Sequence, residues 1–436
     1  MPQTPAATDI FYDLQGGQKV KAIDPSDPLV TLKPRTPFHT HICSNHVTVQ
    51  KAVKKRAAQK KAARFEKAIS ADALMTHIQD LVVHEWVMKI DGRFLLNGYA
   101  GSRAMSRLRR AQKQKGSLEK SLDVSFQSDV PIFEPTNAFD PNLPIVLECR
   151  QKNNYYHFIV ETLSLFPSLV ANDYTGAILI HCNDANQAGF ADAFVKTLFP
   201  GLADRVEFVS NIDPVSYDTA LLPFDLRHVF PTAEGGVCRS GDLSAIAAED
   251  RDQLFSGQLS ARQVQANFIP EGLYKLREHA LKTSEALPKT LTPKRIFVDR
   301  KQDKSRPRPT EGIEKLRPVL KEIGFETVYF EELSPLAQIQ MMHQAEICVA
   351  IHGAGLTNML FASPKTRMIE LANVDSTDHR WDNFIRLAEV AGCDYHKVYA
   401  DAVGEDPSDV NYKGLRPIAL TDVAIVRVAE LVEDYE

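Results

Sequence analysis

The sequence contains few cysteines and no hydrophobic run long enough to cross a membrane. Of its 436 residues, 44% are hydrophobic and 25% are charged, as in ordinary globular proteins. No stretch reaches the about 18 apolar residues of a spanning helix, and the polar opening MPQTPAATDIFYDLQGGQ leads us to expect no signal peptide. The six cysteines form no CxxC pair, which disfavours a zinc knuckle or a disulfide framework. We expect buried, reduced thiols and a cytoplasmic protein.

Motifs of several common enzyme classes are also absent. Neither GxGxxG nor GxxxxGK[ST] occurs, which excludes the dinucleotide fingerprint and the P-loop, and HExxH and GxSxG are missing as well. A single DxD, Asp250-Arg251-Asp252, lies in a polar stretch with a helical pattern rather than after a strand. We interpret it as surface charge, and we predict no metal and no other cofactor.

Charge is spread unevenly along the chain. The net charge of −5 disfavours a generally basic nucleic-acid-binding protein. Segment 51–67 nevertheless holds eight Lys and Arg with one Glu, and segment 103–120 holds seven with one Glu. These segments are either solvated helical faces or a docking surface for an anionic membrane or a lipid-linked phosphate. Without interleaved aromatic residues, they give no support for nucleic acid as a partner.

The predicted elements divide the chain into five parts. Residues 1–130 are predicted to form a mainly helical, basic N-terminal region. Short β-rich runs alternate with helical stretches over 131–238 and again over 291–400, which is typical of βαβ units with parallel strands. Residues 239–290 have the pattern of a helical connection and 401–436 that of a C-terminal helical segment. The sequence thus predicts an α/β fold with two Rossmann-like domains facing a cleft, where ligands bind at the C-terminal ends of the strands.

The sharpest motif is EICVAIHGAGLTNMLF at 346–361. A buried strand is predicted to end at Ile351 and a helix to begin near Leu356, after a glycine-containing turn. Such a turn directs backbone N–H groups and a positive helix end at one spot, where glycine lets a phosphate approach closely. The residues predicted to surround that phosphate are His352, Gly353, Ala354, Gly355, Thr357 and Asn358. The alternative is a tight strand-to-helix turn that binds no ligand.

Two further features favour a nucleotide ligand at this end of the sheet. Glu370 ends the next predicted strand, where a carboxylate can accept both hydroxyls of a ribose. Arg300 and Arg306 lie in the basic loop VDRKQDKSRPRP, and guanidinium groups bind diphosphates through paired hydrogen bonds. Taken alone, each feature could equally be an exposed strand-end acid or a solvated basic loop.

A third motif, NNYYHFIVETLSLFPSL at 153–169, reads as an amphipathic helix. His157 and Glu161 are four residues apart on its polar face, so their side chains can touch. A carboxylate beside an imidazole raises its basicity and fixes its orientation, which makes a general base for activating a hydroxyl. The alternative is a structural polar pair on a packed helix.

Taken together, these motifs resemble glycosyltransferase family 61. The helical motif resembles that family's N-Y-(Y/F)-H-W-x-x-E-x-L-P-R-L element, and VDRKQDKSR is similar to its strand-end Arg segment. The block AIHGAGLTNMLFASPKTRMIEL resembles the family's G-x-H-G-A-G-L-T-N and I-E-L signature. The resemblance extends over roughly residues 140–400, with departures that include Phe158 in place of Trp and Ser168 in place of Arg.

The resemblance implies a GT-B fold and an inverting, metal-independent transfer from a nucleotide sugar, with a UDP-sugar favoured. Residues 131–238 would form the acceptor domain and 291–400 the donor domain. The acceptor would be a hydroxyl of a glycan or a lipid-linked glycan in bacterial capsule or surface-polysaccharide synthesis. The enzyme would then be cytoplasmic, with a peripheral contact at the inner face of the membrane.

The residues leave the catalytic base and the function class open. His157 oriented by Glu161 is the preferred base, and Glu161 with His157 as its partner is the alternative. A non-catalytic nucleotide-sugar or glycan-binding component of a polysaccharide assembly would show a nucleotide effect without turnover. A pyruvyl transferase on a GT-B-like frame would show no response to nucleotide diphosphates.

Overall fold

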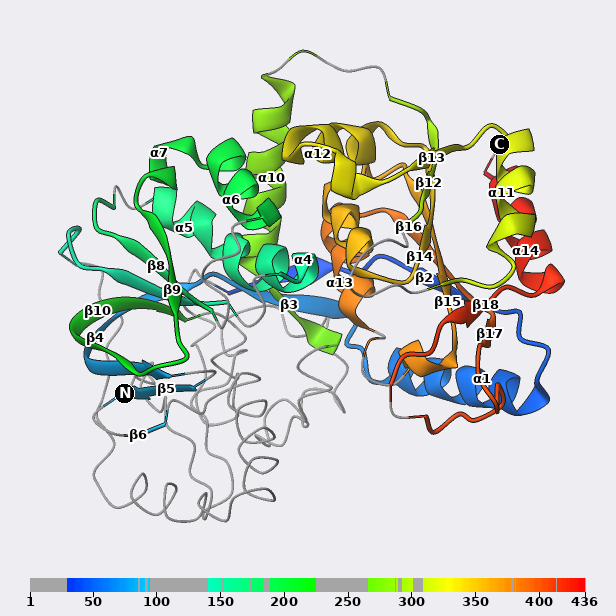
Figure 1. The fold of residues 1–436 in the computed structure, drawn as a ribbon, viewed down its shortest axis with the longest axis horizontal. Coiled ribbons are helices and arrows are strands. Elements are labelled where there is room, and N and C mark those ends of the chain that lie inside the picture. Colours follow the sequence, from blue (N-terminus) through cyan, green and yellow to red (C-terminus); the bar gives the residue numbers. More distant parts are fainter. Residues whose placement is uncertain are drawn as a thin grey trace. The chain divides into compact units, whose positions relative to one another are not determined.

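Figure 1 shows the computed structural model, in which the chain forms two compact units. It describes residues 30–84, 87–90, 93–94, 140–149, 153–171, 174–182, 189–224, 266–286, 288, 292–300, 309–377, 380, 382–412 and 414–435. Unit 1 comprises the described parts of 1–34 and 65–276, and unit 2 those of 35–64 and 277–436. The division differs from the predicted one, because residues 35–64 group with the C-terminal part of the chain.

Unit 1 contains a seven-stranded mixed sheet with the order β6-β5-β4-β10-β7-β8-β9. Its strands are β4 (Leu74–His84), β5 (Val87–Ile90), β6 (Arg93–Phe94), β7 (Ile145–Glu148), β8 (Ile178–Cys182), β9 (Val206–Ser210) and β10 (Val215–Phe224). The strands β10, β7, β8 and β9 are parallel, as predicted from their apolar runs, whereas β4 pairs with β10 in the antiparallel direction. The helices α5 (Phe166–Val170), α6 (Gly189–Leu198) and α7 (Pro200–Ala203) lie along one face (Figure 1).

Unit 1 also contains a small three-stranded sheet, and the chain passes from its last strand into a helix that continues into unit 2. Its strands are β1 (Val30–Pro34), β3 (Lys67–Ala71) and β11 (Phe268–Pro270), with β3 in the centre. The helix α10 (Glu271–Glu285) begins directly after β11, within the predicted helical connection, and its residues are divided between the two units.

The prediction of a mainly helical N-terminal region is wrong for four segments that form strands, Lys67–Ala71, Leu74–His84, Val87–Ile90 and Arg93–Phe94. The helix α1 (Val47–Ala62) does form and includes residues 51–62 of the basic segment 51–67. Short apolar runs are ambiguous between helix and strand, and pairing with a distant strand decides the outcome. Here β4 finds its partner in β10, more than 130 residues later. Segment 103–120 lies outside the described residues.

Unit 2 contains a six-stranded parallel sheet with the order β13-β12-β14-β15-β16-β2. Its strands are β2 (Phe38–Ile42), β12 (Arg295–Val298), β13 (Glu326–Val328), β14 (Ile347–Ile351), β15 (Arg367–Ala372) and β16 (Asp394–Tyr399). Parallel strands covered on both faces read as continuous apolar runs, as in ICVAI of β14. The edge strand β2 comes from the N-terminal part of the chain and pairs with β16.

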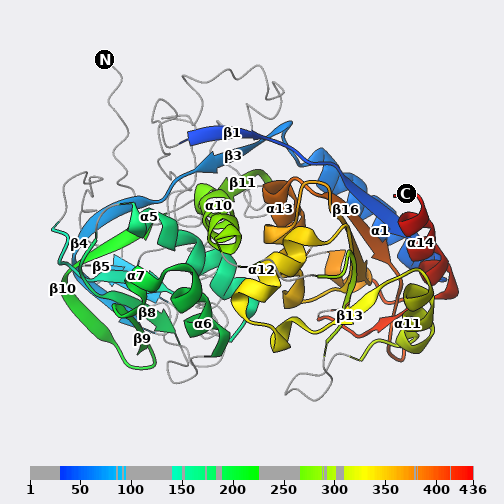
Figure 2. The same ribbon diagram turned by 90° about the horizontal axis from the view of Figure 1, so that it is seen from above.

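Helices cover both faces of this sheet (Figure 2). On one face, α11 (Ile313–Glu322) and α14 (Asp422–Glu433) bury apolar side chains against Phe297, Val349 and Ile369 of the strands. The opposite face is covered by α12 (Pro335–Gln344), α13 (Asp382–Ala391) and the 3₁₀ helix Ala354–Phe361. The helix α12 begins after an N-terminal cap in which Ser334 accepts a hydrogen bond from the Ala337 N–H at 3.3 Å.

The five cysteines in the described residues are all buried, which confirms that expectation for Cys43, Cys149, Cys182, Cys348 and Cys393. Burial raises the pKa of Cys149 to about 12, so its thiol stays protonated at neutral pH. Within the part of the chain that the structure describes, every helix is too short or too polar to cross a bilayer.

Candidate functional site

The glycine-containing turn follows the carboxyl end of β14 in unit 2. The His352 N–H donates to the Leu371 carbonyl at 2.8 Å, and Gly353 then adopts an extended backbone. A 3₁₀ helix rather than the expected α-helix begins at Ala354, and its first hydrogen bond runs from the Leu356 N–H to the Gly353 carbonyl at 3.1 Å. The N–H groups of Ala354 and Gly355 therefore precede the hydrogen-bonded part of the helix and can bind a ligand.

Neither glycine in this turn is required by the fold. A Cβ added to Gly353 would come no closer than 3.8 Å to the Ile351 carbonyl oxygen, and one added to Gly355 no closer than 3.7 Å to Val298. These are ordinary van der Waals contacts, and neither residue has the positive φ that favours glycine. Among the described residues, an added methyl group would therefore fit at either glycine without a clash, and without one the backbone N–H groups stay accessible to an anionic group.

His352 is held by a buried polar network centred on Glu370. The His352 Nδ1 lies 2.5 Å from Glu370 Oε1, and Lys397 Nζ lies 3.1 Å from the same oxygen. The Tyr395 hydroxyl donates to Glu370 Oε2. Glu370, Lys397 and Tyr395 are at most 1% exposed, and Glu370 lies opposite Lys397 in the pairing of β15 with β16. Both carboxylate oxygens of Glu370 thus have partners within unit 2.

The charges of this network follow from its contacts. Burial raises the pKa of Glu370, but Lys397, His352 and the Tyr395 hydrogen bond outweigh burial and lower it to about 2. Burial lowers the pKa of His352, against an opposing effect of Glu370. A neutral His352 therefore donates its Nδ1–H to the ionised carboxylate, which can only accept, and its Nε2 remains an acceptor.

The surroundings of Glu370 differ from those expected from the sequence. An open strand end beside the ligand was predicted, but the carboxylate is buried because Tyr395 and Lys397 of the adjacent strand close over it. Neither residue is among those expected at this site from the sequence. The signal was present in DYHKVYA, where a lysine interrupts a predicted buried strand, since a buried lysine needs an anionic partner.

The other predicted donor-site residues have varied surroundings. Asn358 is buried and donates to Gln338 Oε1 at 3.1 Å, so it braces the 3₁₀ helix from within. Thr357 is also buried, and its hydroxyl has no hydrogen-bond partner among the residues that the structure describes. Arg300 follows β12, and its N–H donates to the Asp299 carboxylate at 2.7 Å. Arg306 lies outside the described residues.

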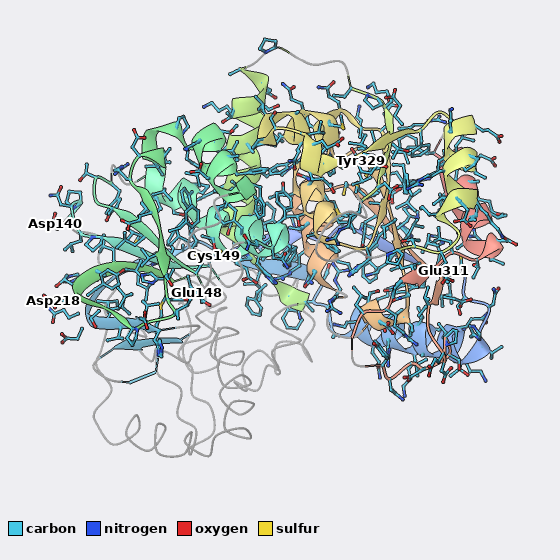
Figure 3. The ribbon with its side chains drawn as sticks, viewed as in Figure 1. Asp140, Glu148, Cys149, Asp218, Glu311 and Tyr329 are labelled. Carbon is cyan, nitrogen blue, oxygen red and sulfur yellow. The ribbon has the colours of Figure 1, made fainter. Side chains whose placement is uncertain are left out.

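The predicted His–Glu pair is present in unit 1. Glu148 and Cys149, labelled in Figure 3, mark the carboxyl end of β7. Asn154 accepts from the Tyr156 N–H at 3.1 Å and so caps the short helix α4 (Tyr155–His157). His157 Nδ1 lies 3.1 Å from Glu161 Oε1, and the two side chains are 15% and 12% exposed. With Nδ1 facing the carboxylate, Nε2 is the nitrogen that can take a proton.

The helix that carries this pair is not the uniform α-helix expected from the sequence. A π-helical turn spans Phe158–Thr162, and a 3₁₀ turn at Leu163–Leu165 separates it from α5. Local hydrogen bonds hold the turn, because Thr162 Oγ1 donates to the Glu148 carbonyl at 3.1 Å and Ser164 Oγ to the Val160 carbonyl at 2.8 Å. Single π turns are rare in proteins, and those that occur are often found at functional sites.

One protein-family model covers both the His157–Glu161 pair and the glycine-containing turn. Residues 155–369 match the family model described as Glycosyltransferase 61. The match includes His157, Glu161 and the whole glycine-containing turn, and it ends one residue before Glu370. No curated protein matches the chain.

Proposed function

We propose that the protein transfers a sugar from a nucleotide-diphosphate sugar, inverts the anomeric centre and needs no divalent metal. The match of residues 155–369 to the glycosyltransferase family 61 model makes it a glycosyltransferase. The acceptor is a hydroxyl of a glycan or lipid-linked glycan, and a UDP-sugar is the favoured donor. Unit 1 serves as the acceptor half and unit 2 as the donor half of a GT-B fold.

The observation that carries the donor assignment is the open turn at Gly353 and Gly355. The N–H groups of Ala354 and Gly355 supply two donors to the diphosphate, and among the described residues no atom lies closer than 3.7 Å to a Cβ added at either glycine. Arg300 and Arg306 follow β12, the neighbour of β14 in the sheet. Their guanidinium groups neutralise the charge that develops on the leaving diphosphate. In metal-dependent enzymes a divalent ion stabilises this charge.

Glu370 acts in this proposal as a positioning residue rather than as the ribose ligand. Its carboxylate fixes the ring of His352 and selects the tautomer with Nδ1 protonated. The Nε2 of His352 then accepts a hydrogen bond from a hydroxyl of the bound donor. Lys397 keeps Glu370 ionised while both are buried.

The catalytic base is His157. Glu161 orients the imidazole, and Nε2 removes the proton of the acceptor hydroxyl. The acceptor oxygen forms a bond to the anomeric carbon while the bond to the diphosphate oxygen breaks on the opposite face, so the configuration inverts. The nucleoside diphosphate leaves with the bonding electrons. Glu161 as the base, with His157 as its partner, is the alternative within the same reaction.

The basic surface of α1 supports a membrane-proximal setting in bacterial surface-polysaccharide synthesis. Lys51, Lys54, Lys55 and Lys61 are exposed on this helix. Each Lys near an anionic membrane contributes about 1 kcal/mol of attraction. The protein then works as a cytoplasmic enzyme in peripheral contact with the inner membrane face.

A thermal-shift panel of UDP, GDP, CDP, CMP and their sugars, with and without EDTA, tests the donor site. One nucleotide should raise the Tm regardless of EDTA, because a ligand at 100 times its Kd stabilises the folded state by about 2.7 kcal/mol. Gly355→Ala is the matched variant. It should keep the Tm of the free protein and lose most of the nucleotide shift, since its methyl group occupies the approach to the backbone.

The same panel separates the alternatives. No shift by any nucleotide, from a protein that melts cooperatively, contradicts the donor site and favours a pyruvyl transferase or another ligand. A shift without turnover on any glycan acceptor favours a non-catalytic binding component.

A further inference from the structure

A second cluster of ligand-forming side chains lies at the opposite end of the unit 2 sheet from His352. Asp394 is the first residue of β16, and His396 follows two residues later on the same face. His39 lies opposite His396 on the edge strand β2. Their rings stack with centroids 4.6 Å apart, and the His39 side chain is 49% exposed. This cluster lies at the amino ends of the strands, whereas the turn lies at the carboxyl ends.

The three side chains bring one potential ligand atom each close together, although the His39 and His396 rings are stacked at an interplanar angle of 23°. One ligand atom from each of His39, Asp394 and His396 lies within 4.8 Å of the others. His39 Nε2 is 3.7 Å and His396 Nε2 2.9 Å from Asp394 Oδ1. Ligand atoms about 2.0–2.1 Å from a tetrahedral metal ion lie roughly 3.3 Å apart, so small rotations of the half-exposed His39 suffice. Among the residues that the structure describes, no other group of three has this arrangement.

We propose that His39, His396 and Asp394 bind a divalent transition-metal ion of the zinc class, with water as the fourth ligand. Two imidazole nitrogens and one carboxylate oxygen form a ligand set typical of Zn²⁺. Mg²⁺ and Ca²⁺ prefer oxygen ligands and do not suit this set. The ion sits apart from the proposed donor site and plays no part in sugar transfer.

The residues behind the three ligands complete the site. His41 Nε2 lies 3.0 Å from His396 Nδ1, and Arg367 Nε donates to Asp394 Oδ2 at 2.7 Å. The other two atoms, His396 Nε2 and Asp394 Oδ1, lie 2.9 Å apart in a hydrogen bond with each other, and the proposed ion would replace that bond. Such outer contacts orient ligands, and their loss typically weakens metal binding by about 10- to 100-fold.

The proposed ion would link the edge strand β2 to its neighbour β16 through side chains of both strands. His39 belongs to β2, which comes from the N-terminal part of the chain, while Asp394 and His396 belong to β16 more than 350 residues later. Binding to the folded state alone therefore stabilises the pairing of β2 with β16.

Titration calorimetry and thermal melting of the full chain, without an affinity tag and after EDTA treatment and dialysis, test this site. ZnCl₂ should bind with one equivalent dependent on His39 and raise the Tm, and MgCl₂ should do neither. His39→Ala should abolish this equivalent, because His39 supplies one of three ligands and is exposed enough to be replaced without harm to the fold. His41→Ala should weaken binding by about 10- to 100-fold. No nucleotide is present, so the result is independent of the donor site.

Two variants keep the result unambiguous. His77→Ala replaces an exposed histidine of β4 in unit 1 and should leave Zn²⁺ binding unchanged. Asp394→Asn keeps an oxygen for Arg367 and loses the charge that binds the ion, so it should lower affinity even if His39→Ala folds poorly. Absence of Zn²⁺ binding, or binding that is equal in wild type, His39→Ala and Asp394→Asn, overturns the proposal.

Discussion

The protein contains the same pair of side chains in two different environments. His157 and Glu161 in unit 1 are 3.1 Å apart and partly exposed, and they lie four residues apart in one helical segment. His352 and Glu370 in unit 2 are 2.5 Å apart and buried, and they come from the end of one strand and the middle of the next. Glu370 also binds Tyr395 and Lys397.

The two pairs share their residue types but differ in burial and in partners, so we expect them to have different roles. A partly exposed imidazole can exchange a proton with a substrate, whereas an imidazole bonded to an ionised carboxylate in the interior is fixed in one tautomer. The first pair therefore suits proton transfer, and the second suits the shaping of a binding turn. Variants of the two pairs should therefore differ in which quantity they change, kcat or the free energy of unfolding.

The largest expected effect is on turnover in His157→Asn. Loss of a general base lowers kcat by about 10²- to 10⁴-fold, whereas the free energy of unfolding should change by less than about 1 kcal/mol because the side chain is partly exposed. Steady-state kinetics and urea unfolding measure the two quantities. A raised KM for the donor with an unchanged kcat would contradict the assignment. A greater loss in Glu161→Gln than in His157→Asn would make Glu161 the base.

The second effect is on stability in Glu370→Gln. The variant removes the carboxylate that pairs with buried Lys397, and breaking a buried ion pair by removing one partner costs about 3–5 kcal/mol. Urea unfolding of Glu370→Gln beside Glu161→Gln gives the comparison directly, because the second variant should lose less than about 1 kcal/mol. Equal losses in the two variants would show that burial does not distinguish the pairs.

The third effect is on the pH dependence of stability. The pKa of Glu370 is about 2 in the folded protein, below its ordinary value of 4.5. A depressed folded-state pKa means that the stabilisation is fully present above about pH 4.5 and is lost as pH falls through about 2, by roughly 3 kcal/mol in all. The stability difference between wild type and Glu370→Gln should therefore shrink across this window. A difference that stays constant from pH 6 to pH 2.5 would contradict the ionised network.

The sequence could predict the first pair but not the second. His157 and Glu161 are four residues apart, and any helical turn brings them together, even the unexpected π turn. His352 and Glu370 meet only because β14 and β15 are neighbours, and Lys397 joins them only because β16 is next in the sheet. Contacts across strands depend on sheet order, which a single sequence does not contain.

The fold was predicted well where its elements depend on local sequence patterns rather than on pairing between distant strands. The apolar runs of parallel strands are local signals, and the strands β14 and β15 fall in the βα pattern predicted for residues 291–400. The strands β4 and β2 have partners more than 130 and 350 residues away. Their local sequence does not indicate that pairing, so the segment that forms β4, Leu74–His84, was predicted as part of a helical region.

The smallest effect concerns the packing that supports the first pair. A Cβ at Gly272, near the start of α10, would collide with the carbonyl oxygen of Ser164, three residues after Glu161. Gly272→Ala should therefore destabilise unit 1 by about 1–3 kcal/mol, the usual cost of overpacking, and lower kcat by displacing the turn. Gly201→Ala is the matched control, because its added Cβ meets nothing within 4 Å in α7. This control should be neutral or more stable by about 0.5–1 kcal/mol. Urea unfolding and kcat of both variants give the answer, and if Gly272→Ala behaved like Gly201→Ala, the close contact of α10 with Ser164 would not be what holds His157 and Glu161 in place.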